Sequence, residues 1–317
     1  MNRLSYSALF CVLLAMLLTS CESLVTNIPE SKLPQADSKL VVQSVISPQL
    51  PFINVVVTES VPLFSKSDAT EKRLKNATVR LSDGTNEIII PYNSENNLYS
   101  LEQSRFPISA GKTYTLRVSD GKREVRGECT IPAKSPVIKS YKLDTLVLDN
   151  AHYADTAITL KLTWQDIAGD TNYYKVDAVV DLEQSVYSKA AADQFKEKRI
   201  SNTFPFNWEW QQGQKEFFSD NKLDGTLFTS STGKVSLPLD QKMLLNGKEQ
   251  KLPSKTKIKS LVASVFNIDK HYFKYSESVD LRHNSENPLS EPVPLYTNII
   301  GGYGFFAAYN ATQLKVK

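Results

Sequence analysis

Alternation of apolar and polar residues around Asp-Gly pairs constrains the fold of this chain more than any other feature. Residues 78–90 alternate on both sides of Asp83-Gly84, and residues 111–131 repeat the pattern around Asp120-Gly121. A period of two places apolar side chains on one face of a strand, and Asp-Gly is favoured in tight hairpin turns. The sequence therefore predicts consecutive antiparallel hairpins, which are typical of an all-β domain.

The strand-like runs fill residues 40–133, and we expect them to form an immunoglobulin-like β-sandwich. Tyr114, near the start of a late strand, resembles a tyrosine of that fold. Residues 136–317 are predicted to form a larger, mostly antiparallel β domain with one or two short helices. Residues 269–281 have the spacing of a short amphipathic helix, and the Ala- and Lys-rich residues 184–198 are interpreted as a helix or a mobile insertion. The predicted fold class is mainly β.

The N-terminus has the features of an export signal. Arg3 precedes an uncharged apolar run over residues 8–18, which is too short to span a bilayer. The run ends in Leu-Thr-Ser followed by Cys21, which resembles a bacterial lipobox. That resemblance implies that residues 1–20 are a signal peptide and that Cys21 is lipidated, with residues 21–39 as a flexible tether. The alternative is an ordinary secretory signal with a chance cysteine.

Bulk charge and cysteine count bear on the class of function. Without residues 1–20, which contain Arg3 as their one charged residue, 36 basic and 34 acidic side chains remain, a balance of +2. This balance gives no reason to expect nucleic-acid binding. Cys11 leaves with the signal and Cys21 carries lipid, so Cys129 has no partner for an internal disulfide. We expect Cys129 to behave as a small buried hydrophobe.

The sequence contains no pattern that indicates catalysis or metal binding. His152, His271 and His283 lack the spacing of a zinc site, and neither a G-x-S-x-G elbow nor an H-E-x-x-H motif occurs. We therefore expect no catalytic residues, no metal, no cofactor and no enzymatic activity. A glycosidase-like pair of carboxylates has no sequence signature, so a cell-surface hydrolase stays open as an alternative.

An aromatic run between residues 204 and 210 is the main candidate for a contact surface. Phe204, Phe206, Trp208 and Trp210 would share one face of a strand. Such a face is either part of a core or a platform for a ligand or partner. We expect Phe204 and Phe206 to be core residues. Trp208 or Trp210 is expected at the surface, because an indole suits a partly solvated position.

The glycine-rich C-terminal block is predicted to contain a sharp bend. Residues 294–317 have the pattern of two strands separated by Gly301-Gly302, and Gly304 also permits a positive φ or a close backbone approach. The same segment offers Tyr303 and Phe305 as candidate contacts with a ligand or partner.

Two short motifs are candidate modification sites. Thr145 and Thr156 each lie in an Asp-Thr-apolar triplet. These triplets resemble the acceptor sequence for O-glycosylation of exported proteins in Bacteroidota.

Several blocks along the chain together resemble one family. They are Cys21-Glu22, the LVVQSVISP run at residues 40–48, the KNATVRLSDG run at 75–84, GKTY at 111–114, and the segment from Asn287 to Phe306. On these residues the chain resembles the DUF4249 family of Bacteroidota lipoproteins. The resemblance implies an accessory outer-membrane lipoprotein, often encoded beside SusC-like TonB-dependent transporters, and it supplies no catalytic residues.

The resulting functional hypothesis is a non-enzymatic, lipid-anchored outer-membrane protein that is an accessory or ligand-capturing subunit of such a transporter. We expect it to face the cell surface rather than the periplasm. The alternatives are a structural subunit of an envelope secretion or assembly complex, and the cell-surface hydrolase.

Overall fold

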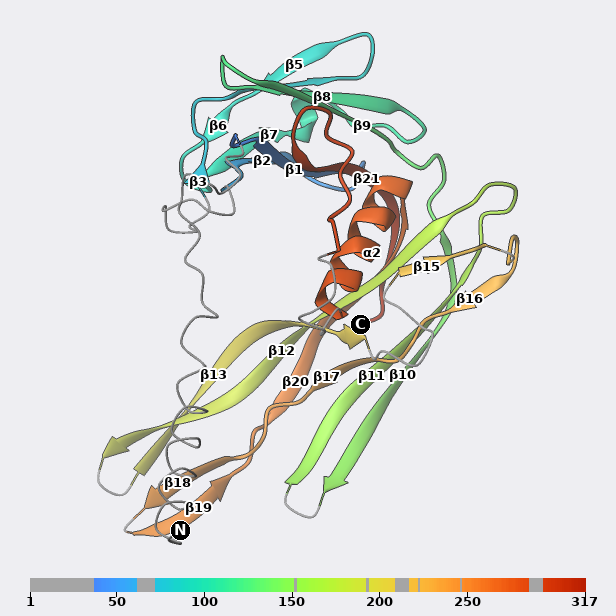
Figure 1. Ribbon diagram of the computed structural model, residues 1–317. Helices are drawn as coiled ribbons and strands as arrows, with labels where there is room; N and C mark the ends of the chain where they lie inside the picture. The colour runs from blue at the N-terminus through green and yellow to red at the C-terminus, as the bar shows by residue number, and fades with distance from the viewer. Residues whose placement is uncertain are drawn as a thin grey trace, which may run out of the picture. The chain divides into compact units, whose positions relative to one another are not determined.

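The computed structural model describes residues 37–61, 72–150, 153–191, 194–208, 217–221, 223–245, 247–284 and 293–317. The expected signal peptide, Cys21 and most of the expected tether lie outside these residues. Strands dominate the described chain, and its one α-helix is α2 (Lys270–Asn284) (Figure 1). The prediction of a mainly β fold is confirmed.

The first half of the chain forms a sandwich of two sheets. One sheet has the order β5-β4-β8-β9, and the opposite layer contains β1, β2, β7 and β6, with β3 beside β2. The bounds are β1 Leu40–Ile46, β2 Phe52–Glu59, β3 Lys72–Arg73, β4 Thr78–Ser82, β5 Glu87–Ile90, β6 Tyr92–Asn93, β7 Leu98–Glu102, β8 Thr113–Ser119 and β9 Glu124–Thr130, with a short 3-10 helix at Gln103–Arg105. Alternate residues of these strands form one buried core.

Both predicted Asp-Gly hairpins are confirmed. Strand β4 pairs with β5, and β8 pairs with β9, each in antiparallel register across its turn. Gly84 and Gly121 have positive φ angles of 89° and 88°. The Asp83 carboxylate accepts hydrogen bonds from two backbone amides of its own turn, and Asp120 does the same. The turn chemistry therefore fixes the register of both hairpins.

The Tyr114 hydroxyl accepts a hydrogen bond from the backbone amide of Ser109, at 2.8 Å. This is the arrangement of a tyrosine corner. A second tyrosine repeats it later in the chain: the Tyr174 hydroxyl accepts from the amide of Ile167 at 3.0 Å and donates to Asp166 at 2.7 Å. Tyr174 is fully buried near the start of its strand, so the second half of the chain contains a tyrosine corner like that of the first half.

The second half forms another two-layer β structure. One layer contains β12 (Tyr173–Ala191), β13 (Gln194–Pro205), β15 (Phe217–Ser219) and β20 (Thr256–Ile268); the other contains β10 (Val137–Asn150), β11 (Tyr153–Gln165), β14 (Asn207–Trp208), β16 (Leu227–Thr229) and β17 (Gly233–Ser236). Residues from both layers pack into a second core around Trp164. Residues 184–198, which we interpreted as a helix or mobile insertion, instead lie mostly in the β12–β13 hairpin.

A single C-terminal strand pairs with strands of both halves. Strand β21 (Tyr303–Lys315) pairs with β1 in parallel through residues 303–308, and then with β20 in antiparallel through residues 309–315. It thereby joins strands of the first sandwich and strands of the second half into one ten-stranded sheet. The division into domains over residues 40–133 and 136–317 stays a prediction.

The approach to β21 differs in part from what we predicted. Gly301 and Gly304 do have positive φ, as the glycine pattern indicated. The segment before them is not a strand, however, because residues 293–299 have irregular structure and Ile300 makes an isolated bridge with Arg126 of β9. The side chain of Asn298 replaces strand pairing there: it accepts from the amide of Phe306 and donates to the Phe306 carbonyl.

We predict that Gly304→Ala prevents stable folding. The φ of Gly304 is +99°, and an added Cβ would overlap the backbone carbonyl of Val42 in β1. Residues 303–308 pair with β1 and residues 309–315 with β20, so the strand cannot move away without breaking a ladder, and the cost should exceed about 3 kcal/mol. Gly84→Ala is the matched control, since its φ is +89° and a Cβ there meets nothing within 4 Å; it should cost about 1 kcal/mol. Equal losses in denaturant unfolding experiments would contradict this account.

Candidate functional site

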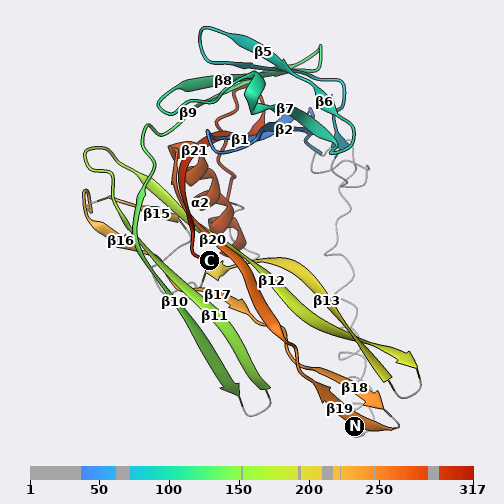
Figure 2. The ribbon, with the colours of Figure 1, turned by 180° about the vertical axis from the view of Figure 1, so that it is seen from behind.

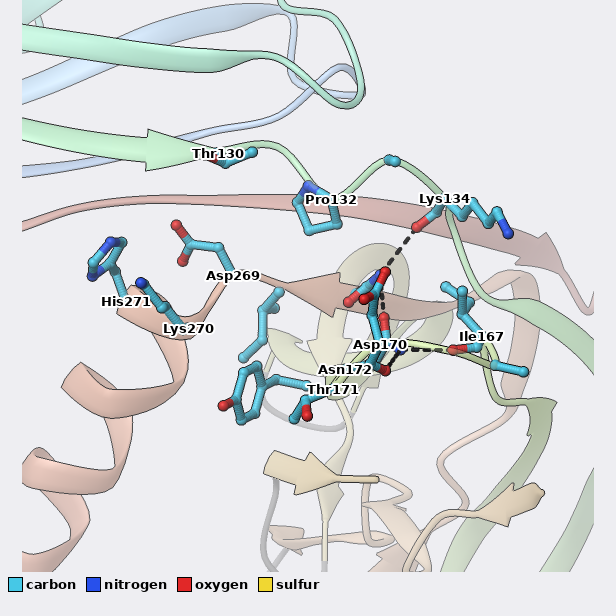
Figure 3. A pocket seen from close by; sticks show the side chains of 15 residues that line it. Thr130, Pro132, Lys134, Ile167, Asp170, Thr171, Asn172, Asp269, Lys270 and His271 are labelled. Atoms are coloured by element: carbon cyan, nitrogen blue, oxygen red, sulfur yellow. Dashed lines mark hydrogen bonds between the residues drawn. The ribbon is translucent and has the colours of Figure 1, made fainter. Parts of the chain in front are cut away.

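The main candidate site is a cavity of about 540 Å³ where three segments of the chain meet. They are the end of β9 with the linker that follows it, the loop between β11 and β12, and the junction of β20 with α2. Figure 3 shows Asp269, Lys270 and His271 at one end of this cavity, and Asn172, Asp170 and Lys134 at the other. Its volume lies within the range of small-ligand pockets, about 300–1,000 Å³.

Two buried amide side chains hold these three segments together. Asn267 of β20 donates to the Lys134 carbonyl of the linker at 3.1 Å and to the Asn172 side chain at 3.2 Å. Asn172 in turn donates to the carbonyls of Ile167 and Asp170 in its own loop, at 2.7 and 2.5 Å. The dashed lines in Figure 3 mark this network. Because the donors of both amides are used within the protein, they shape the cavity wall, and the wall is formed in advance of any ligand.

Asp269 is the most perturbed acid of the cavity. One carboxylate oxygen caps α2 by accepting from the amide of Tyr272 at 2.8 Å, and the Asp269 backbone amide donates to Ala308 of β21 at 2.9 Å. The residue is 8% exposed, and its other carboxylate oxygen, Oδ2, is buried with no hydrogen-bond partner among the described residues. Burial raises the pKa of Asp269 to about 7, although backbone hydrogen bonds at the helix start oppose the shift.

The groups around Asp269 are also perturbed. Cys129 of β9 is buried, as predicted, and burial, together with the nearby Asp269 charge, raises the pKa of its thiol well above the usual range. Burial lowers the pKa of His271, whose Nδ1 lies 2.7 Å from the Tyr296 hydroxyl. The thiol is therefore held in its neutral form, which is a poor nucleophile. This end of the cavity is suited to hydrogen bonding, with Asp269 near the midpoint of its titration at neutral pH.

A second cluster of acidic residues borders the cavity loop. Carboxylate oxygens of Asp166, Asp220 and Asp224 all lie within 4.8 Å of one another, and Asp166 and Asp220 are buried. They accept hydrogen bonds from the Tyr174 hydroxyl and from the backbone amides of Gly225, Asn172 and Gly169. An all-oxygen donor set of this kind matches hard cations such as Ca²⁺. The hydrogen bonds already connect the loop of residues 166–172 to the loop of residues 220–226.

The sequence analysis did not identify Asp269, Asn172, Asn267 or this acidic cluster. The segments DIAGDTN at 166–172 and DNKLDGT at 220–226 contain the signal for the cluster, since each has two aspartates spaced four residues apart. Their proximity depends on pairing between segments about fifty residues apart, which no local pattern reveals. Asp269 could have been identified as a helix cap, because it is an aspartate at the first position of the predicted helix.

The aromatic run at 204–210 does not form a single strand. Strand β13 ends at Pro205, the amide of Phe206 donates to Ala178, and Asn207–Trp208 pairs with β17 in the other layer. The run thus crosses between the two sheets of the second half. Phe206 is buried in the second core, as predicted, and Phe204 and Trp208 are half-buried against the same core. A contact role for Trp208 stays a prediction, and Trp210 lies outside the described residues.

The other predicted contact and modification residues do not line the cavity. Tyr303 is 47% exposed at the start of β21, with the Lys39 amine 5.0 Å from its ring centre. Phe305 is half-buried and stacks on Tyr275 of α2, with ring centres 4.0 Å apart. Thr145 is exposed on β10 and Thr156 is half-buried on β11. Contact with a partner and O-glycosylation stay predictions for these residues.

Comparison with known proteins assigns the chain to a family. A family model described as "Domain of unknown function (DUF4249)" matches residues 22–315, and the chain therefore belongs to that family. No curated protein matches the chain. Among solved structures, a "Biofilm associated protein - B domain" aligns with 7% identity over 87% of this chain and 85% of that chain, at a TM-score of 0.19. A TM-score this low carries no argument about fold or function.

We predict that Asp269 makes the stability of the protein fall as pH rises toward neutral. Its pKa is about 7 in the folded protein and 3.8 in the unfolded reference. Below pH 3.8 Asp269 is protonated in both the folded and the unfolded protein, so its contribution to stability is complete. Between pH 3.8 and about 7 the folded protein alone retains the proton, and this contribution to stability is lost as pH rises through about 7. The loss should amount to at most about 4 kcal/mol.

The measurement is the free energy of unfolding from pH 4 to pH 8 for the wild type and for Asp269→Asn. Asparagine retains a capping oxygen but carries no charge. The free energy of unfolding of the variant, relative to that of the wild type, should therefore increase from pH 4 to pH 8. Parallel stability curves for the two proteins would show that Asp269 titrates normally.

Proposed function

We propose that this chain is a non-enzymatic lipoprotein of the Bacteroidota outer membrane, anchored through Cys21. In this proposal it is an accessory or ligand-capturing subunit of a SusC-like TonB-dependent transporter and faces the cell surface. The lipobox-like sequence supports the anchor. The envelope setting is what the resemblance to the DUF4249 family implies, and the family model matches residues 22–315. Within the described residues, no helix is both long and apolar enough to cross a bilayer.

The observation that carries the ligand-capturing role is the preformed cavity with its buried acid. Apolar side chains of Pro132, Ile167 and Ile268 line it beside the polar groups of Asp170 and Asp269. Binding sites for small molecules combine apolar walls with a few polar groups in this way. Asp269 can accept a hydrogen bond when ionised and donate one when protonated, so the cavity suits a compact polar molecule that presents a complementary group.

The first arm of the test is localisation. Cys21→Ala should move the protein from the membrane to the soluble fraction, because losing the acyl chains removes about 0.8 kcal/mol for each buried methylene group. Cys11→Ala is the matched control, since Cys11 lies in the expected signal peptide and should be dispensable. Retention of the Cys21→Ala protein in salt-washed membranes would contradict the anchor.

The second arm tests the partner. Affinity purification of the wild type from native membranes in mild detergent should recover a large β-barrel transporter, and deletion of the gene should cause a nutrient-specific growth defect. Repeated recovery of the lipoprotein alone would contradict the transporter role. General envelope damage on deletion would instead favour a structural subunit.

A further inference from the structure

A two-stranded ribbon in the second half of the chain lies outside both cores. Strands β18 (Gln241–Leu245) and β19 (Lys248–Leu252) pair with each other and form a separate sheet. Figures 1 and 2 both show the ribbon beside the far end of the β12–β13 hairpin. Two hydrogen bonds attach its base to β12: the Tyr187 amide donates to the Gln241 side chain at 2.6 Å, and the Tyr187 hydroxyl donates to the Pro253 carbonyl at 3.1 Å. The ribbon is thus held in a defined place.

The end of this ribbon presents an exposed leucine. Leu244 is 67% exposed, whereas the leucines of the two cores are almost fully buried. The strand turns beside Gly247, which has a φ of +74°, and Lys248 follows directly. A two-stranded ribbon gains little stability from its own pairing. Leu244 belongs to neither core, so it is available for contact with another surface.

The same segment is strongly basic. Residues 239–259 contain six lysines and two acids, Asp240 and Glu249, a net charge of +4, while the whole chain has +3. Within the segment, Lys242 pairs with Glu249 at 3.0 Å and Lys251 with Asp240 at 3.3 Å. Two further lysines pair with acids of the neighbouring hairpin: Lys255 with Glu197 at 3.2 Å and Lys259 with Glu183 at 2.9 Å. In the described structure, Lys248 and Lys257 are exposed and form no ion pair. On the neighbouring hairpin, Lys196 and Lys198 of β13 are exposed, whereas Arg199 pairs with Glu183 of β12 at 3.0 Å.

We infer that the ribbon and the adjoining lysines are a docking surface for anionic lipid headgroups, with Leu244 entering the boundary between headgroups and acyl chains. In the ribbon, Leu244 lies opposite Glu249, which is paired with Lys242, and Lys242 and Lys251 share the face of Leu244. Lysine amines attract phosphate groups at a membrane surface, and an apolar side chain beside them gains free energy by entering that boundary. Charge alone would also suit an acidic polysaccharide. The exposed Leu244 favours lipid, because a hydrated polysaccharide offers no apolar layer for it.

No residue of this surface lines the cavity, and the surface would orient the protein on the membrane independently of the anchor. The test uses the mature chain, residues 21–317, with Cys21→Ala so that no acyl chain can attach. Co-sedimentation is measured with vesicles of phosphatidylcholine and with vesicles of equimolar phosphatidylcholine and phosphatidylglycerol. We expect binding to the anionic vesicles that weakens with salt, and little binding to the zwitterionic ones.

Two matched pairs of variants test the residues. Lys248→Gln should weaken vesicle binding about fivefold, whereas Lys122→Gln should not, although Lys122 also follows a positive-φ glycine in a hairpin turn. Leu244→Ser should weaken binding about tenfold, whereas Leu227→Ser, at a leucine with 61% exposure on β16, should leave it unchanged. Thermal melts of all four variants confirm that each is folded.

Three results would overturn the inference. They are absence of binding to anionic vesicles, equal binding to both kinds of vesicle, and vesicle binding that is insensitive to Leu244→Ser. If a sulfated polysaccharide such as heparin binds and competes fully with vesicles while Leu244→Ser has no effect, the surface recognises polyanions and not lipid. None of these outcomes depends on whether a transporter is recovered, so failure here is distinguishable from failure of the proposed function.

Discussion

The pairing of β21 with strands on both of its sides is the constraint on which the rest of the structure depends. Its first half completes the first sandwich beside β1, and its second half completes the other sheet beside β20. Phe306 and Ala308 belong to the first core, and Val316, just beyond the strand, packs on the second. Both cores therefore lose contacts if this strand is displaced. The positive φ of Gly304 and the close approach of β1 explain why no larger residue fits there.

Hydrogen bonds from strand side chains reinforce this junction. Asn310 and Thr312 of β21 donate to the carbonyls of Pro132 and Pro136, and Asn267 of β20 donates to Lys134 between them. The linker backbone is thus satisfied by side chains, although it lies in no sheet. This attachment creates the cavity, because the linker is held across the ends of β20 and the β11–β12 loop. Asp269 lies at the same junction, so its protonation state bears on both the cavity and the packing of α2 against β21.

The sequence predicted well those features that depend on local chemistry. Asp83-Gly84 and Asp120-Gly121 specified hairpins because aspartate and glycine satisfy the turn backbone directly, and Tyr114 indicated its corner for a similar reason. The helix predicted at 269–281 is α2, observed at 270–284. Residues 184–198 were misassigned because their Ala- and Lys-rich composition favours a helix, while pairing with β13 imposes a strand.

Features that depend on long-range pairing could not be predicted. Parallel pairing of β1 with β21 joins residues more than 250 positions apart, and no local pattern encodes it. The same holds for the burial of Asp269, whose neighbours Cys129 and Ala308 come from distant strands. The aromatic run was predicted as one face because its alternation is regular. Its crossing between two sheets at Phe206 depends on where β17 lies, and this again is tertiary information.

The most direct test of the shared-strand account compares the unfolding of the two cores with probes that the chain itself supplies. All three tryptophans (Trp164, Trp208 and Trp210) lie in the second half, and Trp164 is fully buried in the second core. In the mature chain with Cys21→Ala, Cys129 is the sole thiol and reports on the first core. Tryptophan fluorescence and Cys129 labelling should follow the same denaturant transition with one midpoint, because β21 couples the cores. Two separate midpoints would show that the cores unfold independently and would contradict the account.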